Sequence, residues 1–218
     1  MLPSRRTPGH GGPRTALSVA CAAALLLTAA CGAAKGPAAA ANHLKCSAGG
    51  GSVASPPAGV TTMGAPINTP VQLIHGHTLA EVFTASAPIL QVGAQSPTWF
   101  TTGSGYTLTL LQGAGLKGKP LSCTTITAAT DNEWNVLNLS NAAPAGVYTL
   151  LMDHPTGTAQ QACPGHRTDP NCSTTPLSGK KGGVIGWWSN GTGASAGAYA
   201  LVDGKKNGGS FSVFYEAQ

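Results

Sequence analysis

The sequence predicts an all-β protein whose folded part is an antiparallel β-sandwich of the jelly-roll kind. Short β-type segments follow one another along the chain, and turn-forming residues separate them. Only 9% of the residues are charged, whereas 30 of the 218 are glycine and 16 are proline. Such a composition favours turns and strands, because the surfaces of helices usually need Glu, Lys and Arg. No long segment has the apolar periodicity of a helix, so we expect many short strands in two packed sheets.

Ten segments carry the pattern of strands. Tyr106–Leu110 alternates between large side chains and threonine, which is typical of a strand with one buried face. Phe211–Val213 alternates in the same way. The predicted strands are Val71–His75, Glu81–Ala85, Ile89–Val92, Tyr106–Gln112, Thr124–Ala128, Asn135–Leu139, Gly146–Asp153, Gly183–Trp188, Ala198–Val202 and Ser210–Tyr215. We therefore assign residues 67–218 to the β-sandwich domain.

The first 31 residues have the order of an export signal. Arg5, Arg6 and Arg14 form a basic segment, residues 16–30 form an uncharged and mostly apolar one, and small residues lead into Cys31. This ending resembles the lipobox of bacterial lipoproteins. The resemblance implies a signal peptide over residues 1–30, cleavage before Cys31, and a diacylglyceryl group on the Cys31 sulfur. The alternative is a plain secretory peptide in which Cys31 has no such role.

The signal implies that the rest of the chain works outside the cytoplasm, anchored to the outer face of the cell membrane. Residues 31–66 contain mostly Ala, Gly, Ser and Pro and few large apolar side chains. Such a segment buries too little surface to offset its ordering entropy, so we expect a flexible tether. His43, Leu44 and Cys46 are the exception, and we expect the tether to dock there.

The charge of the exported part is close to balance. Three of the twelve Lys and Arg residues lie in the signal, so nine remain against seven Asp and Glu. So small an excess argues against a nucleic-acid partner and against a polybasic membrane surface.

Four cysteines remain after the signal and the predicted lipid site. They are Cys46, Cys123, Cys163 and Cys172. An even number of cysteines in an oxidising compartment predicts disulfides, and three pairings are open. A Cys163–Cys172 pair would close a short loop whose Pro-Gly and Asp-Pro pairs favour turning back, and Cys46–Cys123 follows by elimination. A zinc site is the alternative, with His154 and His166 near the second pair of cysteines.

A series of short motifs resembles the jelly-roll accessory modules of secreted bacterial hydrolases, which are related to galactose-binding-like and other carbohydrate-binding domains. The resemblance covers about residues 68–218. The motifs are Tyr106-Thr-Leu-Thr-Leu, Asn132-Glu-Trp-Asn-Val-Leu-Asn-Leu, Pro144-Ala-Gly-Val-Tyr-Thr-Leu, Gly186-Trp-Trp and the closing Asp203-Gly with Phe211-Ser-Val-Phe. The resemblance implies a non-catalytic module that binds carbohydrate or another envelope ligand.

Aromatic residues are the candidate ligand contacts, because apolar faces of sugars stack on aromatic rings. The candidates are Trp187, Trp188, Trp99 and Tyr199. Neighbours on a strand point to opposite faces, so only one of Trp187 and Trp188 can face the core. The alternative is that the outward one is covered by the loop between Cys163 and Cys172.

Asp131, Asn132 and Glu133 are candidate ligands of a structural calcium ion, which prefers clustered carboxylate and carbonyl oxygens. The alternative is an ordinary solvated turn. His75 and His77 alternate on one side of a predicted strand and form a feasible metal pair, but the sequence offers no third ligand.

Gly193–Gly197 matches the G-x-S-x-G pattern around a hydrolase nucleophile, with Ser195 at its centre. That mechanism needs a strand before the serine and a helix after it, and the chain offers neither, so we expect a loop. The sequence thus predicts a lipid-anchored, non-catalytic binding module. The alternatives are a structural or protein-interaction lipoprotein of the envelope and, less well supported, a secreted hydrolase.

Overall fold

The computed structural model describes residues 44–49, 51–101, 103–156, 185–190 and 196–218. Within these ranges the chain forms strands and no helix, which confirms the predicted all-β class, and no membrane-spanning helix is found there. The strands are β1 (Ser47–Ala48), β2 (Ser52–Val53), β3 (Thr61–Met63), β4 (Thr69–Leu73), β5 (Leu79–Ala85), β6 (Ile89–Ser96), β7 (Gly105–Gln112), β8 (Lys119–Ile126), β9 (Glu133–Ala143), β10 (Gly146–Thr156), β11 (Ile185–Ser189), β12 (Tyr199–Val202), β13 (Lys205–Lys206) and β14 (Val213–Ala217).

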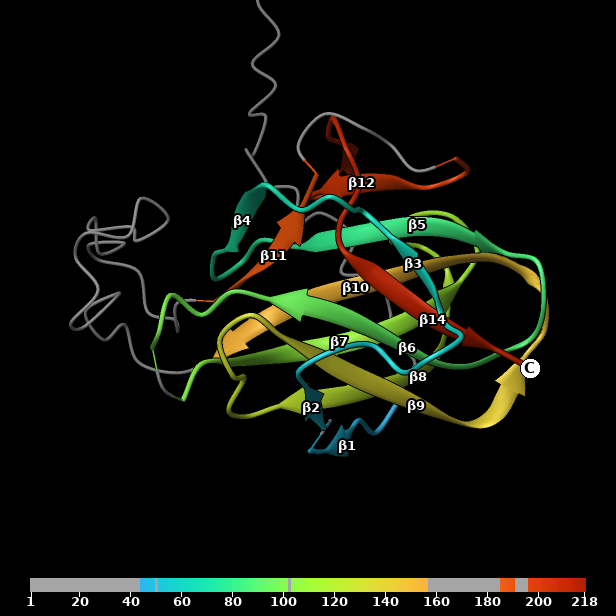
Figure 1. Ribbon diagram of the computed structural model, residues 1–218, viewed down its shortest axis with the longest axis horizontal. Coiled ribbons are helices and arrows are strands. Elements are labelled where there is room, and N and C mark those ends of the chain that lie inside the picture. Colours follow the sequence, from blue (N-terminus) through green and yellow to red (C-terminus); the bar gives the residue numbers. More distant parts are fainter. Residues whose placement is uncertain (1–43, 50, 102, 157–184, 191–195) are drawn as a thin grey trace, which may run out of the picture. The chain divides into compact units, whose positions relative to one another are not determined.

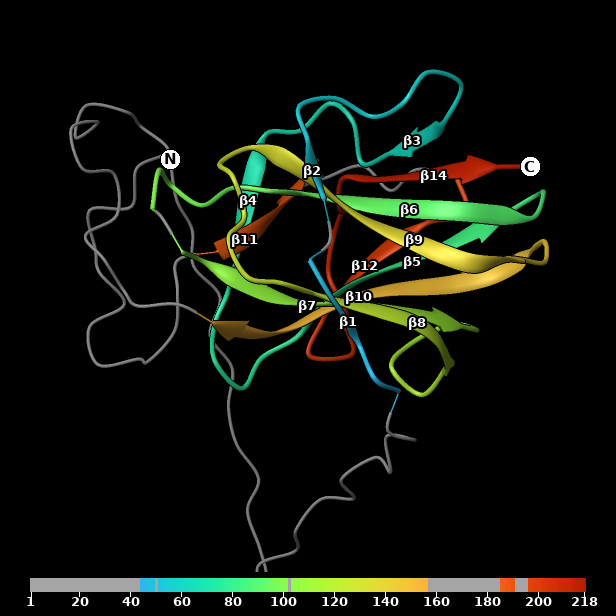
Figure 2. The same cartoon turned by 90° about the horizontal axis from the view of Figure 1, so that it is seen from below.

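Most of these strands form two sheets that face each other as the layers of a sandwich (Figure 1, Figure 2). The seven-stranded sheet has the order β1-β8-β7-β10-β5-β12-β13, and the five-stranded sheet has the order β2-β9-β6-β14-β3. Strands β11 and β4 form a separate pair beside the end of β6, where the Gly186 N–H donates to the Pro97 carbonyl at 3.0 Å. Strand β1 runs parallel to β8, and the other pairs are antiparallel.

Each of the ten predicted strands has a counterpart in the structure, although the bounds differ by a few residues. The alternation in β7 is confirmed. Tyr106, Leu108 and Leu110 are fully buried between the sheets, whereas Thr107 and Thr109 are partly exposed on the other face. Period-two alternation is therefore a sound guide to which face of this sheet is the core.

Aromatic rings join the two layers at the centre of the core. The Phe83 ring of β5 is stacked on the Tyr215 ring of β14, with centroids 5.6 Å apart. On its own sheet Phe83 also contacts Tyr148 of β10, at a centroid distance of 6.0 Å. Burying rings of this size contributes much of the hydrophobic stabilisation of a small core.

A short segment ahead of β14, Ser210–Ser212, connects all three sheets, and we call it the crossover. The Ser210 hydroxyl and the Phe211 N–H both donate to the carboxylate of Glu81 in β5, the latter at 2.8 Å. The Ser212 carbonyl accepts from the Trp187 indole N–H at 2.9 Å and from a backbone N–H of β6. The Ser212 N–H donates to a backbone carbonyl of β11 at 2.7 Å.

The prediction of a flexible tether over residues 31–66 is wrong for the described residues from 44 onward. In this part β1 pairs with β8, β2 pairs with β9, and β3 pairs with β14, so the segment covers edges of both sheets. The domain therefore begins well before residue 67. The physical reason is that backbone groups at an open sheet edge need partners, and a chain of small residues supplies them without large side chains. The remainder of the predicted tether lies outside the described residues.

Gly64 shows why a small residue is required at one place in this segment. Its φ is +74°, and a Cβ atom built on it would lie 2.2 Å from the carbonyl oxygen of Phe211. Both the backbone conformation and the close approach demand glycine. The segment after β3 therefore packs directly against the backbone of the crossover.

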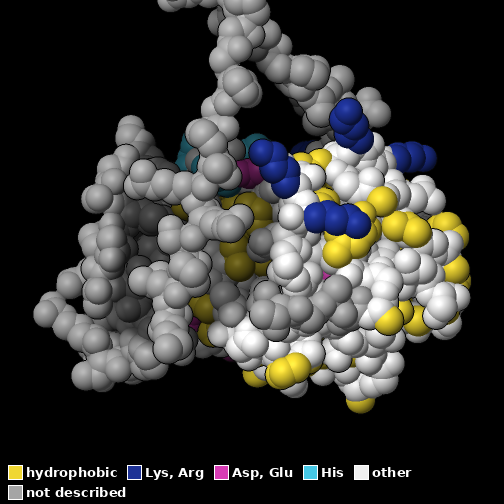
Figure 3. Space-filling model, turned by 90° about the horizontal axis from the view of Figure 1, so that it is seen from above, with side chains coloured by type: hydrophobic (Ala, Val, Ile, Leu, Met, Phe, Trp, Pro, Cys, Tyr) yellow, Lys and Arg dark blue, Asp and Glu magenta, His cyan; other side chains and the backbone are white. Residues whose placement is uncertain are grey.

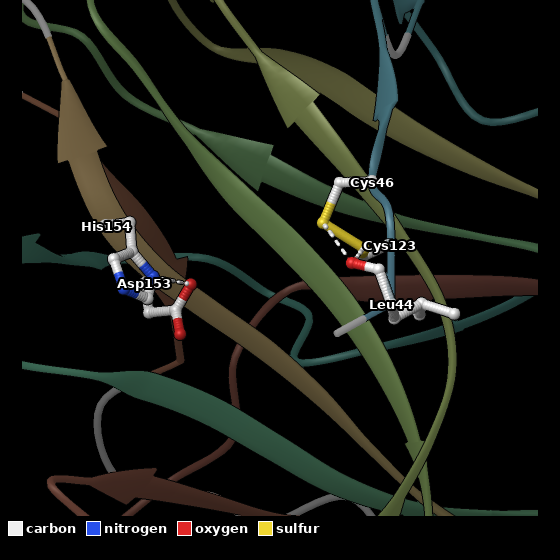
Figure 4. A network of polar contacts seen from close by, with 5 residues as sticks. All are labelled: Leu44, Cys46, Cys123, Asp153 and His154. Atoms are coloured by element: carbon white, nitrogen blue, oxygen red, sulfur yellow. Dashed lines mark hydrogen bonds and ion pairs between the residues drawn. A yellow bond between two sulfur atoms is a disulfide. The ribbon is translucent and has the colours of Figure 1, made fainter. Parts of the chain in front are cut away.

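Cys46 and Cys123 form a disulfide that fastens β1 to β8 (Figure 4). The Leu44 carbonyl oxygen lies 4.0 Å from Cys46 Sγ and 3.8 Å from Cys123 Sγ. The predicted pairing of these two cysteines is confirmed, and it excludes them as ligands of the alternative zinc site. Cys163 and Cys172 lie outside the described residues, so their pairing stays a prediction.

Removing this disulfide should lower the stability of the domain substantially. The two cysteines are 77 residues apart in sequence, and closing a loop of that length is worth about 4 kcal/mol in the chain-entropy account. We expect the double variant Cys46→Ser with Cys123→Ser to unfold at a clearly lower urea concentration than the wild type. Ser47→Ala is the matched control, because it removes only the hydrogen bond to the Cys123 carbonyl. Equal unfolding midpoints for the double variant and the wild type would contradict this role.

Candidate functional site

Strand β11 sends its two tryptophans to opposite faces, as predicted. Trp187 faces the core, where it is fully buried and stacked on the Phe211 ring at a centroid distance of 4.8 Å. Its indole N–H donates a hydrogen bond to the Ser212 carbonyl. The prediction that Trp187 contacts a ligand is therefore wrong, because the residue is a core side chain whose polar atom is already satisfied.

Trp188 points to the other face and is half-buried. Its indole N–H donates to Asn132 Oδ1 at 2.8 Å, which fixes the orientation of the ring. Across the strand pair Trp188 lies opposite Pro70, and Gly186 lies opposite Gln72. Directly paired residues of antiparallel strands share a face, so Pro70 and Gln72 flank the indole. We call Pro70, Gln72, Asn132 and Trp188 the Trp188 surface.

Trp99 lies on the same face of β11 as Trp188. The side chain is 7% exposed, and a Cβ atom built on Gly186 would lie 2.8 Å from the Trp99 ring. The ring therefore occupies the space that a side chain at position 186 would need. The prediction that Trp99 contacts a ligand is therefore wrong, because the ring is buried and packs over Gly186, beside Trp188.

Phe100 is the exposed aromatic residue that the sequence analysis missed. It follows Trp99 directly and is 37% exposed. Both residues have positive φ values, 50° for Trp99 and 60° for Phe100, which is unusual for bulky side chains. This backbone turn directs one ring inward and leaves the next exposed. No pattern in the sequence signals it, because consecutive left-handed residues are expected at Gly or Asn rather than at aromatics.

The carboxylate of Asp131 holds the loop that carries these two aromatic residues. Asp131 Oδ1 accepts from the Thr98 N–H at 2.6 Å and from the Thr98 hydroxyl at 3.1 Å. Asp131 Oδ2 accepts from the Asn132 side-chain amide at 2.8 Å. The Asn132 N–H donates to the Ser96 carbonyl at 3.0 Å. The turn of Asp131 and Asn132 thus connects the Trp99 loop to the indole of Trp188.

These bonds bear on the predicted calcium site at Asp131, Asn132 and Glu133. Both oxygens of Asp131 are engaged by donors of the protein, and Asn132 Oδ1 is engaged by Trp188. The described residues contain no group of three or more His, Cys, Asp or Glu side chains placed to hold a metal. Calcium binding at this turn therefore stays a prediction, and the observed role of Asp131 and Asn132 is to orient the Trp188 surface.

Tyr199 belongs to a different surface. It lies on β12 of the seven-stranded sheet, whose outer face it covers together with Leu151 and Leu201. The Lys206 ammonium lies 4.0 Å from the centroid of the Tyr199 ring, in a cation–π contact. Tyr199 does not join the Trp188 surface, because the two residues belong to different sheets.

Two of the histidines that the sequence offers as metal ligands, His77 and His154, lie beside carboxylates. His77 Nδ1 lies 2.8 Å from Asp203 Oδ2, and the Thr78 N–H donates to Asp203 Oδ1 at 2.9 Å. The backbone bond from Thr78, and after it the bond from His77, lowers the pKa of Asp203. His154 Nδ1 lies 2.8 Å from Asp153 Oδ1 (Figure 4). Ser195 and His166 lie outside the described residues.

Glu81 is a buried acid that the sequence analysis took as an ordinary strand residue. It is fully enclosed between the sheets, where it accepts from Ser210 and from the Phe211 N–H. Burial raises its pKa from 4.5 to about 8, and the two hydrogen bonds only partly oppose this effect. At neutral pH the carboxyl group is therefore mostly protonated. Its neighbour Phe211 stacks on Trp187, so Glu81 supports the strand that carries Trp188.

No protein-family model matches the chain, and no curated protein matches it. The function is therefore inferred from the residues and surfaces of the chain alone.

The buried carboxyl group predicts a pH dependence of stability. Below pH 4.5 Glu81 is neutral in both the folded and the unfolded chain, so the folded state carries no penalty. Between pH 4.5 and about 8 the unfolded chain ionises while the folded chain stays protonated, so stability falls as pH rises. We expect the free energy of unfolding to drop by a few kcal/mol between pH 5 and pH 9 because of this group.

The measurement is urea unfolding of the wild type and of Glu81→Gln at both pH values. The amide cannot ionise, so the variant should lose this part of the pH dependence. Glu216→Gln, which removes a carboxylate outside the core, should keep it. The same slope for the wild type and Glu81→Gln would show that the buried group does not titrate as stated.

Proposed function

We propose that this protein is a lipid-anchored, non-catalytic binding module that holds a carbohydrate or another envelope ligand on its Trp188 surface. The observation that carries the proposal is the division of the tryptophan pair. The Trp187 ring is buried in the core, whereas the Trp188 ring is half-exposed and its N–H donates to Asn132. A ring that is oriented in advance loses little freedom on binding, which favours a contact surface over an incidental exposed side chain.

The chemistry around Trp188 fits a sugar ring. The indole offers an apolar face for the C–H groups of a sugar, and Gln72 offers hydrogen-bonding groups beside it. The segments that build the surface contain two carboxylates, Asp131 and Glu133, and no lysine or arginine. Acidic polysaccharides would be repelled there, so we infer a neutral or amino sugar as the ligand class.

The anchor is the second part of the proposal. Its support is the order of basic segment, apolar segment and Cys31, which resembles a lipoprotein signal. Downstream of this position the chain enters the domain at β1, where the disulfide to Cys123 fastens it to β8. A pull on the anchor is therefore transmitted to a cross-linked edge of the seven-stranded sheet.

A structural or protein-interaction role in the envelope is the second candidate. The observation that favours it is the exposed Phe100 ring, an apolar group that a protein partner would bury. A protein partner would be recovered from membranes by cross-linking independently of competition by sugars. The hydrolase alternative rests on Ser195, which lies outside the described residues.

Replacing Trp188 should abolish most of the ligand binding without unfolding the domain. A central aromatic contact is worth on the order of 2 kcal/mol, so we expect Trp188→Ala to bind about 30-fold more weakly. The measurement is a panel of envelope polysaccharides followed by titration of the intrinsic tryptophan fluorescence. Tyr199→Ala is the matched control, since it removes a half-buried ring from the other surface. Failure of every polysaccharide to bind, or equal losses in both variants, would count against a sugar site at Trp188.

Replacing the predicted lipid site should abolish acylation of the protein. We expect Cys31→Ser to abolish the incorporation of labelled fatty acid, because the sulfur that would carry the diacylglyceryl group is absent. Cys46→Ser is the control, since the disulfide cysteine should leave labelling unchanged. Equal labelling of the wild type and Cys31→Ser would contradict the anchor, and it would leave the Trp188 proposal untouched.

A further inference from the structure

The outer face of the seven-stranded sheet carries an apolar layer that is separate from the core. Ala80, Val82 and Leu201 are buried there, with Leu151 and Tyr199 half-buried around them. The loop between β7 and β8 folds down onto this layer and adds Leu116 to it. The hydroxyl of Thr149 holds the loop in place, since it donates to the Gly113 carbonyl and accepts from the Gly115 N–H, both at 2.8 Å.

Lysines surround this layer. A Cβ atom built on Gly204 would lie 3.2 Å from Leu116, so the turn between β12 and β13 touches the β7–β8 loop. The turn leads into Lys205 and Lys206, and the loop brings Lys117 and, at the start of β8, Lys119. Figure 3 shows basic side chains gathered beside exposed apolar ones on one face of the domain. The register places Lys206 beside Leu201 on the outer face, whereas Lys205 pairs with Val202 and Lys119 with Gln112 on the side of the core. We call Lys117 and Lys206 with Leu116, Tyr199 and Val147 the lysine face.

Two carboxylates lie near this face, and Asp203 offsets the charge of Lys205, with which it interacts electrostatically. Asp203 is bonded to His77 and to the Thr78 N–H. Asp153, farther along the same face of β10, is paired with His154. The remaining exposed carboxylates of the described part lie on the β8–β9 turn and on the five-stranded sheet. Lys117 and Lys206 thus form a positive patch on a chain whose exported part is close to charge balance, and this favours an anionic partner.

The lysine face combines this charge with exposed apolar side chains. Val147 is 41% exposed on the outer side of β10, and its carbonyl accepts from the Gly113 N–H of the loop at 2.8 Å. The Lys206 ammonium lies over the Tyr199 ring, which keeps the charge close to the apolar surface. A polyanionic chain would need only the charges. A bilayer takes up both groups, since apolar side chains enter the interface while lysines contact the headgroups.

We propose that the lysine face docks the domain onto the surface of an anionic lipid bilayer. This role goes beyond the proposed ligand site, because it is built on another sheet and leaves the Trp188 surface available. It is also independent of the lipid anchor, which acts through Cys31. The attraction is electrostatic and therefore weakens with salt.

The test uses the chain from residue 31 onward, which is the product of the proposed cleavage, with Cys31→Ser, so that neither the signal segment nor an acyl chain contributes to binding. Sedimentation with vesicles of phosphatidylcholine alone is compared with vesicles of equal parts phosphatidylcholine and phosphatidylglycerol. We expect binding to the anionic vesicles only, reversed by salt. Each of Lys117→Gln and Lys206→Gln should lower the partition coefficient about fivefold, the effect of one lysine near such a surface.

Lys45→Gln is the matched control, since it removes the same charge near β1, at the opposite edge of the sheet order from β13. It should leave vesicle binding unchanged. Val147→Gln should weaken binding without changing the net charge. Equal losses for Lys45→Gln and Lys206→Gln, equal binding to neutral vesicles, or binding to soluble polyphosphate but not to vesicles would each overturn the proposal. None of these outcomes bears on the expected loss of polysaccharide binding in Trp188→Ala, so the two proposals can fail separately.

Discussion

Three consecutive residues, Ser210, Phe211 and Ser212, hold the three sheets of this domain together. Their backbone and hydroxyl groups bond to Glu81 of the seven-stranded sheet, to β11 and to β6 of the five-stranded sheet. Phe211 adds a stacked contact with Trp187. The hydrophobic contact between two facing sheets is non-directional and does not fix how the sheets are placed. These hydrogen bonds are directional, so they set the position of one sheet relative to the other. The crossover thereby also decides where β11 lies and which way Trp188 faces.

The crossover requires a carboxyl group, that of Glu81, to be buried in the core. A carboxyl group in the middle of a strand is buried with only two donors, and burial raises its pKa to about 8. An apolar residue would fit the alternation of β5 better, but it could not accept from both Ser210 and the Phe211 N–H. The buried acid therefore satisfies the crossover, and the core carries a protonated carboxyl group near neutral pH.

Local patterns were enough to predict the strands and the division of the tryptophan pair. The alternation in β7 and the adjacent positions of Trp187 and Trp188 depend only on the two-residue period of a strand. The same reasoning failed for the segment around β1 to β3, because edge strands are stabilised by backbone bonds to distant partners. It also failed for Trp99 and Tyr199. An aromatic residue type suits a ligand surface, but the sequence does not show whether its ring is exposed or covered.

The sequence by itself therefore determined the all-β class and the approximate strands, because both depend on residues that are close together along the chain. Only the tertiary structure decided that Trp187 is the buried ring and Trp188 the half-exposed one, and that Asn132 orients the latter. It also decided that Lys117 and Lys206 share a face. These facts join residues dozens of positions apart, and their contacts depend on which sheet edges and faces meet, a property that no local period specifies.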